Sequence, residues 1–213
     1  MIQIYYAYTD ILLENDLDSF IEMLSANTKA KLVRLKRKED KDLLLLSTRL
    51  LSKLLVDNEH DDYSLMDLKY SNSGRPFFAD SWFDFNISHT DNCAAVAYSE
   101  NCRIGIDIEK IIDLDYSDFE NLFSQKEWEK INSSTNKNRT FYHYWTLLES
   151  ALKADGRGLP LISSDKIVIN NDKVYIDGKQ WFSEHQLFDP SIACCITSDR
   201  KIEAINMKRM LSI

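Results

Sequence analysis

Residues 16–57 contain neither glycine nor proline, and the spacing of their apolar side chains limits how this chain can fold. Leucines recur at positions 43, 46, 50 and 54, three or four residues apart. This spacing places them on one face of a helix and predicts a helical layer. The β-rich segment at residues 2–8 predicts a strand in front of it.

The second half of the chain repeats this order of elements. Helical spacing over residues 116–130 and 138–154 follows a first group of strand-like runs and precedes a second. The strand-like runs are residues 83–88, 93–98, 103–109, 166–170, 173–176, 180–188, 192–197 and 202–207. The glycines and proline of Gly156–Pro160 end the last helix.

The repeated order predicts an α+β fold. We expect two pseudo-symmetric subdomains, residues 1–102 and 103–213, each with helices packed on a mostly antiparallel sheet. The length of 213 residues and a hydrophobic content of 44% suit such a folded protein.

Charge is distributed unevenly along the chain. The net charge of −8 argues against non-specific nucleic-acid binding, which needs a basic surface. Residues 29–41 are the exception, because seven basic and two acidic residues give this run a local charge of +5. The run is either a solvated helix face or a concentration of positive charge near a site.

The expected location is the cytoplasm. The first ten residues lack the pattern of a signal peptide, and no apolar run approaches the ~18 residues of a membrane span. The four cysteines show no CxxC spacing, and we expect them to pack as small apolar residues.

Two carboxylates close the predicted strand at 103–109. Asp107 and Glu109 share one face of that strand, because side chains alternate along it. The pair is either a solvated strand edge or a site for a hard divalent cation. Gly105 indicates a bulge or a close backbone approach.

A third carboxylate lies in the helix predicted at 138–154. Glu149 and Lys153 are four residues apart and therefore face the same way. They form either a surface ion pair or a metal-ligating glutamate beside a phosphate-binding lysine. The strand predicted at 83–88 ends in Ser88 and His89, which either bond a phosphate or serve the structure.

Taken together, these residues resemble the 4′-phosphopantetheinyl transferases of the surfactin-synthetase-activating type. The resemblance spans roughly residues 28–160. Its five motifs, in order, are Gly74–Pro76 (GRP), Phe85–His89 (FNISH), Ile104–Glu109 (IGIDIE), Phe123–Glu127 (FSQKE) and Phe141–Lys153 (FYHYWTLLESALK).

The resemblance implies a reaction and a site between the two subdomains. Phosphopantetheine would pass from coenzyme A to a serine of an acyl, peptidyl or polyketide carrier protein, with release of 3′,5′-ADP. Asp107, Glu109 and Glu149 would hold Mg²⁺, and Lys153 would contact the pyrophosphate. Glu127 matches the carboxylate proposed as general base; with it, Glu149 and Lys153 complete the implied catalytic set.

The resemblance also implies a coenzyme A site. Lys31, Ser88 and His89 would face the 3′-phosphate, and the loop containing Gly74 and Arg75 would lie along the adenine. Relatives of this length are mostly monomeric, so a monomer is expected. Neither nucleic acid nor a membrane is an expected partner.

Leu148 departs from the family pattern, because a lysine usually stands there. One lost charge-assisted contact costs roughly 1.5–3 kcal/mol, which would weaken catalysis, and Leu148→Lys would then raise the transfer rate. Two alternatives stay open. One is a non-catalytic homologue that binds coenzyme A or a carrier protein, and the other is a Mg²⁺-dependent phosphate-ester hydrolase.

Overall fold

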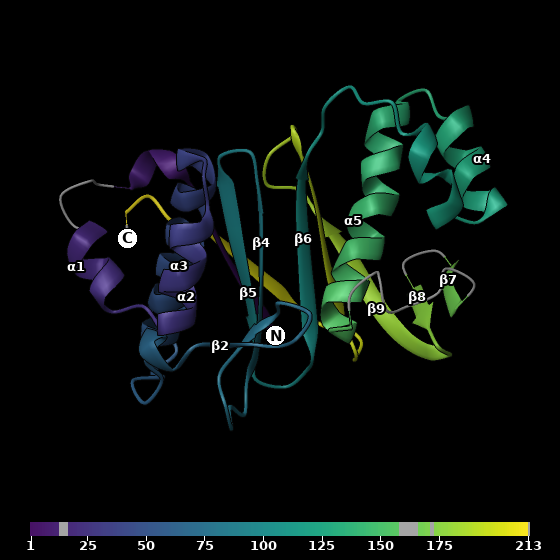
Figure 1. The fold of residues 1–213 in the computed structure, drawn as a ribbon. Helices are drawn as coiled ribbons and strands as arrows, with labels where there is room; N and C mark the ends of the chain where they lie inside the picture. The colour runs from purple at the N-terminus through teal and green to yellow at the C-terminus, as the bar shows by residue number, and fades with distance from the viewer. Residues whose placement is uncertain (13–16, 158–165, 171–172, 213) are drawn as a thin grey trace. The chain divides into compact units, whose positions relative to one another are not determined.

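The computed structural model describes residues 1–12, 17–157, 166–170 and 173–212, and it divides into two compact units (Figure 1). Unit 1 comprises Met1–Asn101 and Ala204–Ile213, and unit 2 comprises Cys102–Glu203. Each unit packs helices against a mainly antiparallel sheet, so the fold is α+β as predicted.

Unit 1 is built on a four-stranded sheet. Its order is β11 (Ile205–Arg209), β1 (Ile2–Tyr8), β5 (Cys93–Ser99) and β4 (Asp84–Thr90). The β1–β5 and β5–β4 pairs are antiparallel, whereas β1 and β11 are parallel. A short ladder joins β2 (Lys69–Tyr70) to β3 (Pro76–Phe77).

Three helices account for the glycine-free region. They are α1 (Leu17–Glu22), α2 (Ala26–Arg34) and α3 (Lys38–Asp57). Ser25 caps α2, because its side chain accepts a hydrogen bond from the Thr28 amide at 3.2 Å. The short 3₁₀ helices η1 (Thr9–Ile11) and η3 (Leu65–Asp67) complete the unit.

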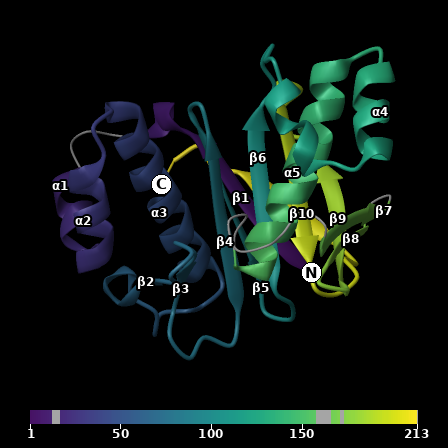
Figure 2. The same cartoon turned by 45° about the vertical axis from the view of Figure 1, so that its right-hand side comes forward.

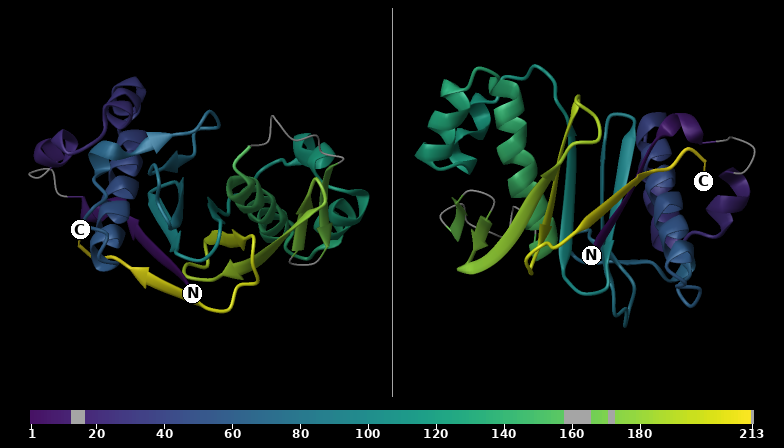
Figure 3. Two further views of the ribbon diagram at one scale, coloured as in Figure 1. Left: turned by 90° about the horizontal axis from the view of Figure 1, so that it is seen from below. Right: turned by 180° about the vertical axis from the view of Figure 1, so that it is seen from behind.

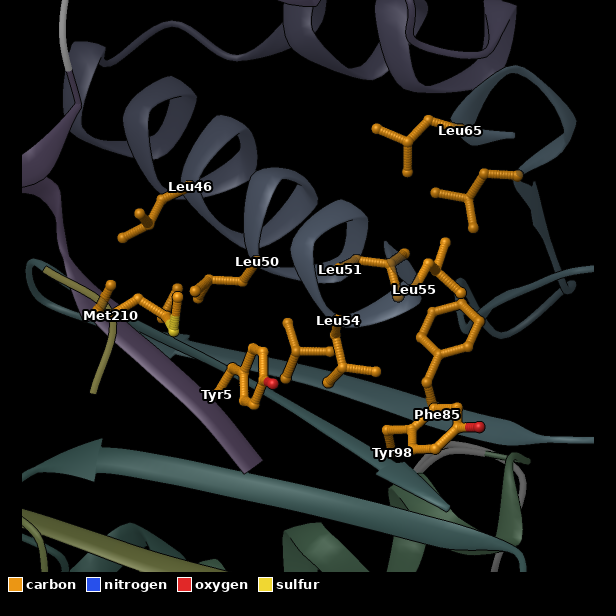
Figure 4. Packing of buried hydrophobic residues seen from close by; sticks show 14 of the residues in the cluster. Tyr5, Leu46, Leu50, Leu51, Leu54, Leu55, Leu65, Phe85, Tyr98 and Met210 are labelled. Carbon is orange, nitrogen blue, oxygen red and sulfur yellow. The ribbon is translucent and has the colours of Figure 1, made fainter. Parts of the chain in front are cut away.

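The core of unit 1 lies between α3 and the sheet (Figure 4). Leu46, Leu50 and Leu54 of α3 are fully buried, which confirms the predicted helix face. They pack with Tyr5 of β1 and Phe85 of β4, as the labelled side chains show.

The last strand departs from the predicted division of the chain. The sequence placed all of 103–213 in the second subdomain and a strand at 202–207. Instead, β11 pairs with β1, from Ile2 opposite Ile205 to Tyr6 opposite Arg209 (Figure 3). Ala204–Ile213 therefore belongs to unit 1, since its backbone hydrogen bonds are made there.

Unit 2 has a five-stranded sheet (Figure 2). Its order is β6 (Ile104–Lys110), β10 (Ile192–Ser198), β9 (Lys179–Gln186), β8 (Lys173–Ile176) and β7 (Ile167–Asn170). All four strand pairs are antiparallel. The long helix α5 (Lys137–Asp155) packs on β6 and β10, and α4 (Gln125–Ser133) packs on α5.

The ends of these helices follow from local chemistry. Helix α5 ends at Gly156, which has the left-handed φ of +88° and donates from its amide to Leu152 O at 2.9 Å. The rest of the predicted stop signal, residues 158–160, lies outside the described residues. The predicted helix at 116–130 is instead a 3₁₀ helix, η4 (Ser117–Leu122), followed by α4.

In the part of the chain that the structure describes, no helix has the length and apolar character needed to cross a membrane. None of the four cysteines, all of which lie in the described ranges, forms a disulfide, and Cys93, Cys194 and Cys195 are buried.

Candidate active site

Strand β6 and helix α5 approach each other closely at Gly105. A Cβ atom at this position would overlap the carbonyl oxygen of Ser150 and the amide nitrogen of Ala154. Both atoms belong to the backbone of α5, so only glycine allows the strand and the helix to meet here. The close approach predicted for Gly105 is therefore found. It limits how far apart the neighbouring side chains of β6 and α5 can lie.

Asp107 lies two residues after Gly105 and meets α5 at Lys153. The Lys153 ammonium donates from Nζ to Asp107 Oδ1 at 2.6 Å. Asp107 is only 2% exposed, whereas the lysine is half-buried. A buried carboxylate needs such a cationic partner, because desolvation of an isolated charge is costly.

Glu149 stands one turn before Lys153 on the same helix. Burial raises the pKa of the Glu149 carboxyl above its ordinary value, and the negative charge of Asp107 raises it further. The positive charge of Lys153 acts in the opposite direction. Asp107 and Glu149 thus repel each other electrostatically, and the single positive charge of Lys153 offsets part of this repulsion.

Glu109 accepts a hydrogen bond from a tryptophan that is not among the predicted site residues. The indole Nε1 of Trp145 donates to Glu109 Oε1 at 3.3 Å. Trp145 is four residues before Glu149, so helical spacing places both on the side of α5 that meets β6. The four-residue spacing between Trp145 and Glu149 is the sequence signal that could have identified Trp145 as a neighbour of the carboxylates.

The carboxylates are not arranged around a common point. Across the described ranges, no three His, Cys, Asp or Glu side chains are placed to hold a metal ion. The predicted ligands Asp107, Glu109 and Glu149 therefore do not form a complete metal site. Lys153 donates to Asp107, and Trp145 donates to Glu109. The donor chemistry still fits Mg²⁺, because a divalent cation would offset the repulsion between Asp107 and Glu149.

Glu127 has a structural role at the start of α4. Its Oε2 accepts hydrogen bonds from the Ser124 amide, at 3.2 Å, and from the Ser124 hydroxyl. This is a capping box, in which each side chain satisfies a backbone group at the helix terminus. Glu127 is buried.

In unit 1, Lys31 of α2 lies beside Tyr70 of β2. Its Nζ lies 5.5 Å from the centre of the Tyr70 ring, and burial lowers the pKa of the amine. The Tyr70 hydroxyl lies 3.0 Å from Thr28 Oγ1, which ties α2 to β2. Lys31 and Thr28 therefore both adjoin β2, and in the loop that follows this strand Gly74 has a φ of +82° that favours glycine.

Arg75 holds this loop against β4. Its Nη2 donates to Asp84 Oδ2 at 2.7 Å and to the Phe85 carbonyl at 3.0 Å. These bonds give the Arg75 side chain a structural role, and the predicted place of the loop along the adenine stays a prediction.

Ser88 and His89 do not share a face. Both lie within the regular β4–β5 ladder, so their side chains point to opposite sides of the sheet. Ser88 is buried and His89 is exposed. The structure therefore does not bring them together as the phosphate-binding pair that the sequence suggested.

Leu148 belongs to the core of unit 2. It is 1% exposed and lies in a cluster with Leu152, Trp181 and Cys195. The position where the family usually has lysine is filled here by a packed apolar side chain.

Acidic side chains beside a lysine suit an enzyme that acts on phosphate esters, because the acidic groups can bind a divalent cation and the lysine can bind a phosphate. Comparison with known proteins gives the family. The model for the 4′-phosphopantetheinyl transferase superfamily matches residues 103–196, and the model for the N-terminal part of 4′-phosphopantetheinyl transferases matches residues 13–101.

Individual relatives agree with these matches. The 4′-phosphopantetheinyl transferase ffp of Bacillus subtilis is 31% identical over 165 residues, which are 75% of this chain and 72% of that protein. The transferase Sfp of Bacillus subtilis strain 168 is 30% identical over the same shares. HetI of Nostoc sp. is 34% identical over 110 residues, 47% of this chain and 46% of that protein.

The chain belongs to the 4′-phosphopantetheinyl transferases and is an enzyme of that family.

Proposed function

We propose that this enzyme transfers the 4′-phosphopantetheine moiety of coenzyme A to a serine hydroxyl of an acyl or peptidyl carrier protein, in a Mg²⁺-dependent reaction. The serine oxygen forms a bond to phosphorus, the pyrophosphate P–O bond breaks, and 3′,5′-ADP leaves. Family membership supports carrier-protein modification.

One observation carries the proposal: Lys153 of α5 donates to Asp107 of β6, two residues after the close approach at Gly105, and the charges of both residues act on Glu149. Two mutually repelling carboxylates and an ammonium group suit a site that takes up a cation and a pyrophosphate together. Phosphoryl transfer depends mainly on such positioning and charge stabilisation.

Each of these residues has a proposed task. Asp107, Glu109 and Glu149 would hold Mg²⁺, which neutralises charge on the pyrophosphate oxygens when it is bound. The Trp145 indole keeps the Glu109 carboxylate oriented. Lys153 would exchange its bond with Asp107 for one with the pyrophosphate, which frees the buried carboxylate for the cation.

Glu127 is proposed to accept the proton of the carrier serine, directly or through water. Its capping bonds hold the carboxylate in one orientation, although the Ser124 hydroxyl already occupies one oxygen. The second carboxylate oxygen is the one that would act.

Coenzyme A would also engage unit 1. Lys31 is proposed to bind the 3′-phosphate, because it is an exposed cation beside Tyr70 of β2, the strand that leads into the Gly74 loop. The exposed His89 is proposed as a second contact, and the buried Ser88, on the opposite face of β4, is left out of the site. The Arg75 side chain would act by fixing the loop that lies along the adenine.

The test is incubation with Mg²⁺, coenzyme A and a panel of apo carrier proteins from fatty-acid, polyketide and peptide synthesis. Intact-mass measurement should show an addition of ~340 Da on at least one carrier. A panel without any such shift would overturn the proposal. Appearance of inorganic phosphate without 3′,5′-ADP would instead identify a hydrolase.

A further inference from the structure

Unit 2 contains a pocket of about 230 Å³ whose lining residues come from α5, β9, β10 and the segment after β6. Arg139 and His143 line it from α5, and His185 lines it from β9. In the described chain, its lining includes no aspartate or glutamate, and Cys194 supplies the remaining titratable group. None of Asp107, Glu109, Glu149 or Lys153 is part of it.

The basic groups converge from two elements. Arg139 and His143 are one helical turn apart and therefore lie on one side of α5. Arg139 is anchored at the wall of the pocket, because its Nη1 donates to the Pro190 carbonyl at 3.3 Å. The rings of His143 and His185 stack with their centres 3.8 Å apart and their planes at 23°.

Two stacked imidazoles at this separation repel each other when both are protonated. A bound anion would offset that repulsion, and a guanidinium beside it would donate charge-assisted hydrogen bonds. Ile111 and Ile192 give the same pocket an apolar wall. The volume is below the ~300–1,000 Å³ typical of drug-sized ligands, so the ligand is a small one.

We propose that this pocket binds a small oxyanion with an apolar body, of the class of organic sulfates, phosphate monoesters and carboxylates. The oxyanion lies against Arg139, His143 and His185, and the apolar body lies against Ile111 and Ile192. The site is separate from the carboxylate cluster at Gly105 and does not depend on the transfer reaction.

The test is calorimetric titration of the full chain with phenyl sulfate, whose charge does not change between pH 6 and pH 8. Imidazole ordinarily titrates near pH 6.5, so binding is expected to be at least about fivefold tighter at pH 6 than at pH 8. Phenyl sulfate should also bind at least about fivefold more tightly than inorganic sulfate, because only the former reaches the apolar wall.

Variants locate the site. Arg139→Gln should weaken phenyl sulfate binding by about tenfold or more, and His185→Gln should flatten its pH dependence. Lys137→Gln removes one positive charge from the same helix outside this pocket, and it should leave the affinity within about twofold. Circular dichroism of each variant confirms folding, and His143→Gln replaces Arg139→Gln or His185→Gln if either does not fold.

Three results would overturn the proposal. They are no saturable binding by the folded wild-type chain at either pH, an affinity that does not change with pH, and an equal loss of affinity in Lys137→Gln and Arg139→Gln. Equal affinities for phenyl sulfate and inorganic sulfate would show that the apolar wall does not contribute to binding, and this would overturn the proposed ligand class.

Discussion

Replacing Gly105 by alanine should separate the two halves of the carboxylate cluster. The added Cβ would overlap Ser150 O and Ala154 N, and it would lie 3.0 Å from Ala154 Cα. All three are backbone atoms of α5, so no side-chain rotation can relieve the overlap. Either α5 or β6 has to move.

The size of the effect follows from this geometry. Overpacking of one methyl group costs about 1–3 kcal/mol, which a folded domain can tolerate. A shift of about 1 Å at Glu149 and Lys153 relative to Asp107 can slow a positioned reaction by about 10²-fold. Gly105→Ala should therefore lose far more activity than stability.

Two measurements separate these effects: the rate of carrier modification by intact mass and the free energy of unfolding in urea. Gly178→Ala is the matched control in unit 2, since a Cβ there meets nothing within 4 Å. Its φ of +79° costs some stability, but its transfer rate should stay near wild type. Wild-type transfer by Gly105→Ala would refute the close-approach argument.

Three further predictions concern other residues. Leu148→Lys should lower the free energy of unfolding by about 3 kcal/mol or more, because it places a charge in a core position, whereas Leu148→Met should cost less than about 1.5 kcal/mol. Urea unfolding checks both, and a stable, faster Leu148→Lys enzyme would contradict the core assignment. Glu127→Gln should keep the helix cap, since glutamine also serves in a capping box, but should slow transfer by about 10²–10⁴-fold. An unchanged kcat would exclude Glu127 as the base. Removal of divalent cations with a chelator should stop transfer, and added Mg²⁺ should restore it; full activity in the chelator would exclude the metal role.

Local patterns predicted most elements, because the spacing of apolar residues is set by the geometry of the element itself. The strands at 2–8 and 173–176 have the predicted bounds, and the apolar stripe of α3 is buried as expected. The pairing of β11 with β1 could not be read in this way. It joins segments about 200 residues apart, and no local pattern specifies which distant edge a strand completes.

The site shows the same limit. Helical spacing placed Glu149 and Lys153 together, and Gly105 indicated the close approach. Strand alternation could have separated Ser88 from His89, but adjacency in the motif favoured reading them as a pair. Leu148 is buried in a cluster that includes side chains of β8 and β9, and a short sequence motif does not describe such packing.

The most direct test of the account is the rate at which Asp107→Asn modifies a carrier protein that the wild-type enzyme modifies. Asparagine preserves the shape of Asp107 and can still accept from Lys153, but it removes the charge at the centre of the cluster. Asp62→Asn, at an exposed position of unit 1, is the control for the same chemical change. The account predicts a loss of about 10²-fold or more for Asp107→Asn and a rate within about twofold of wild type for Asp62→Asn. Asp107→Asn transfer within about threefold of wild type would contradict the central role of the Asp107, Glu149 and Lys153 cluster.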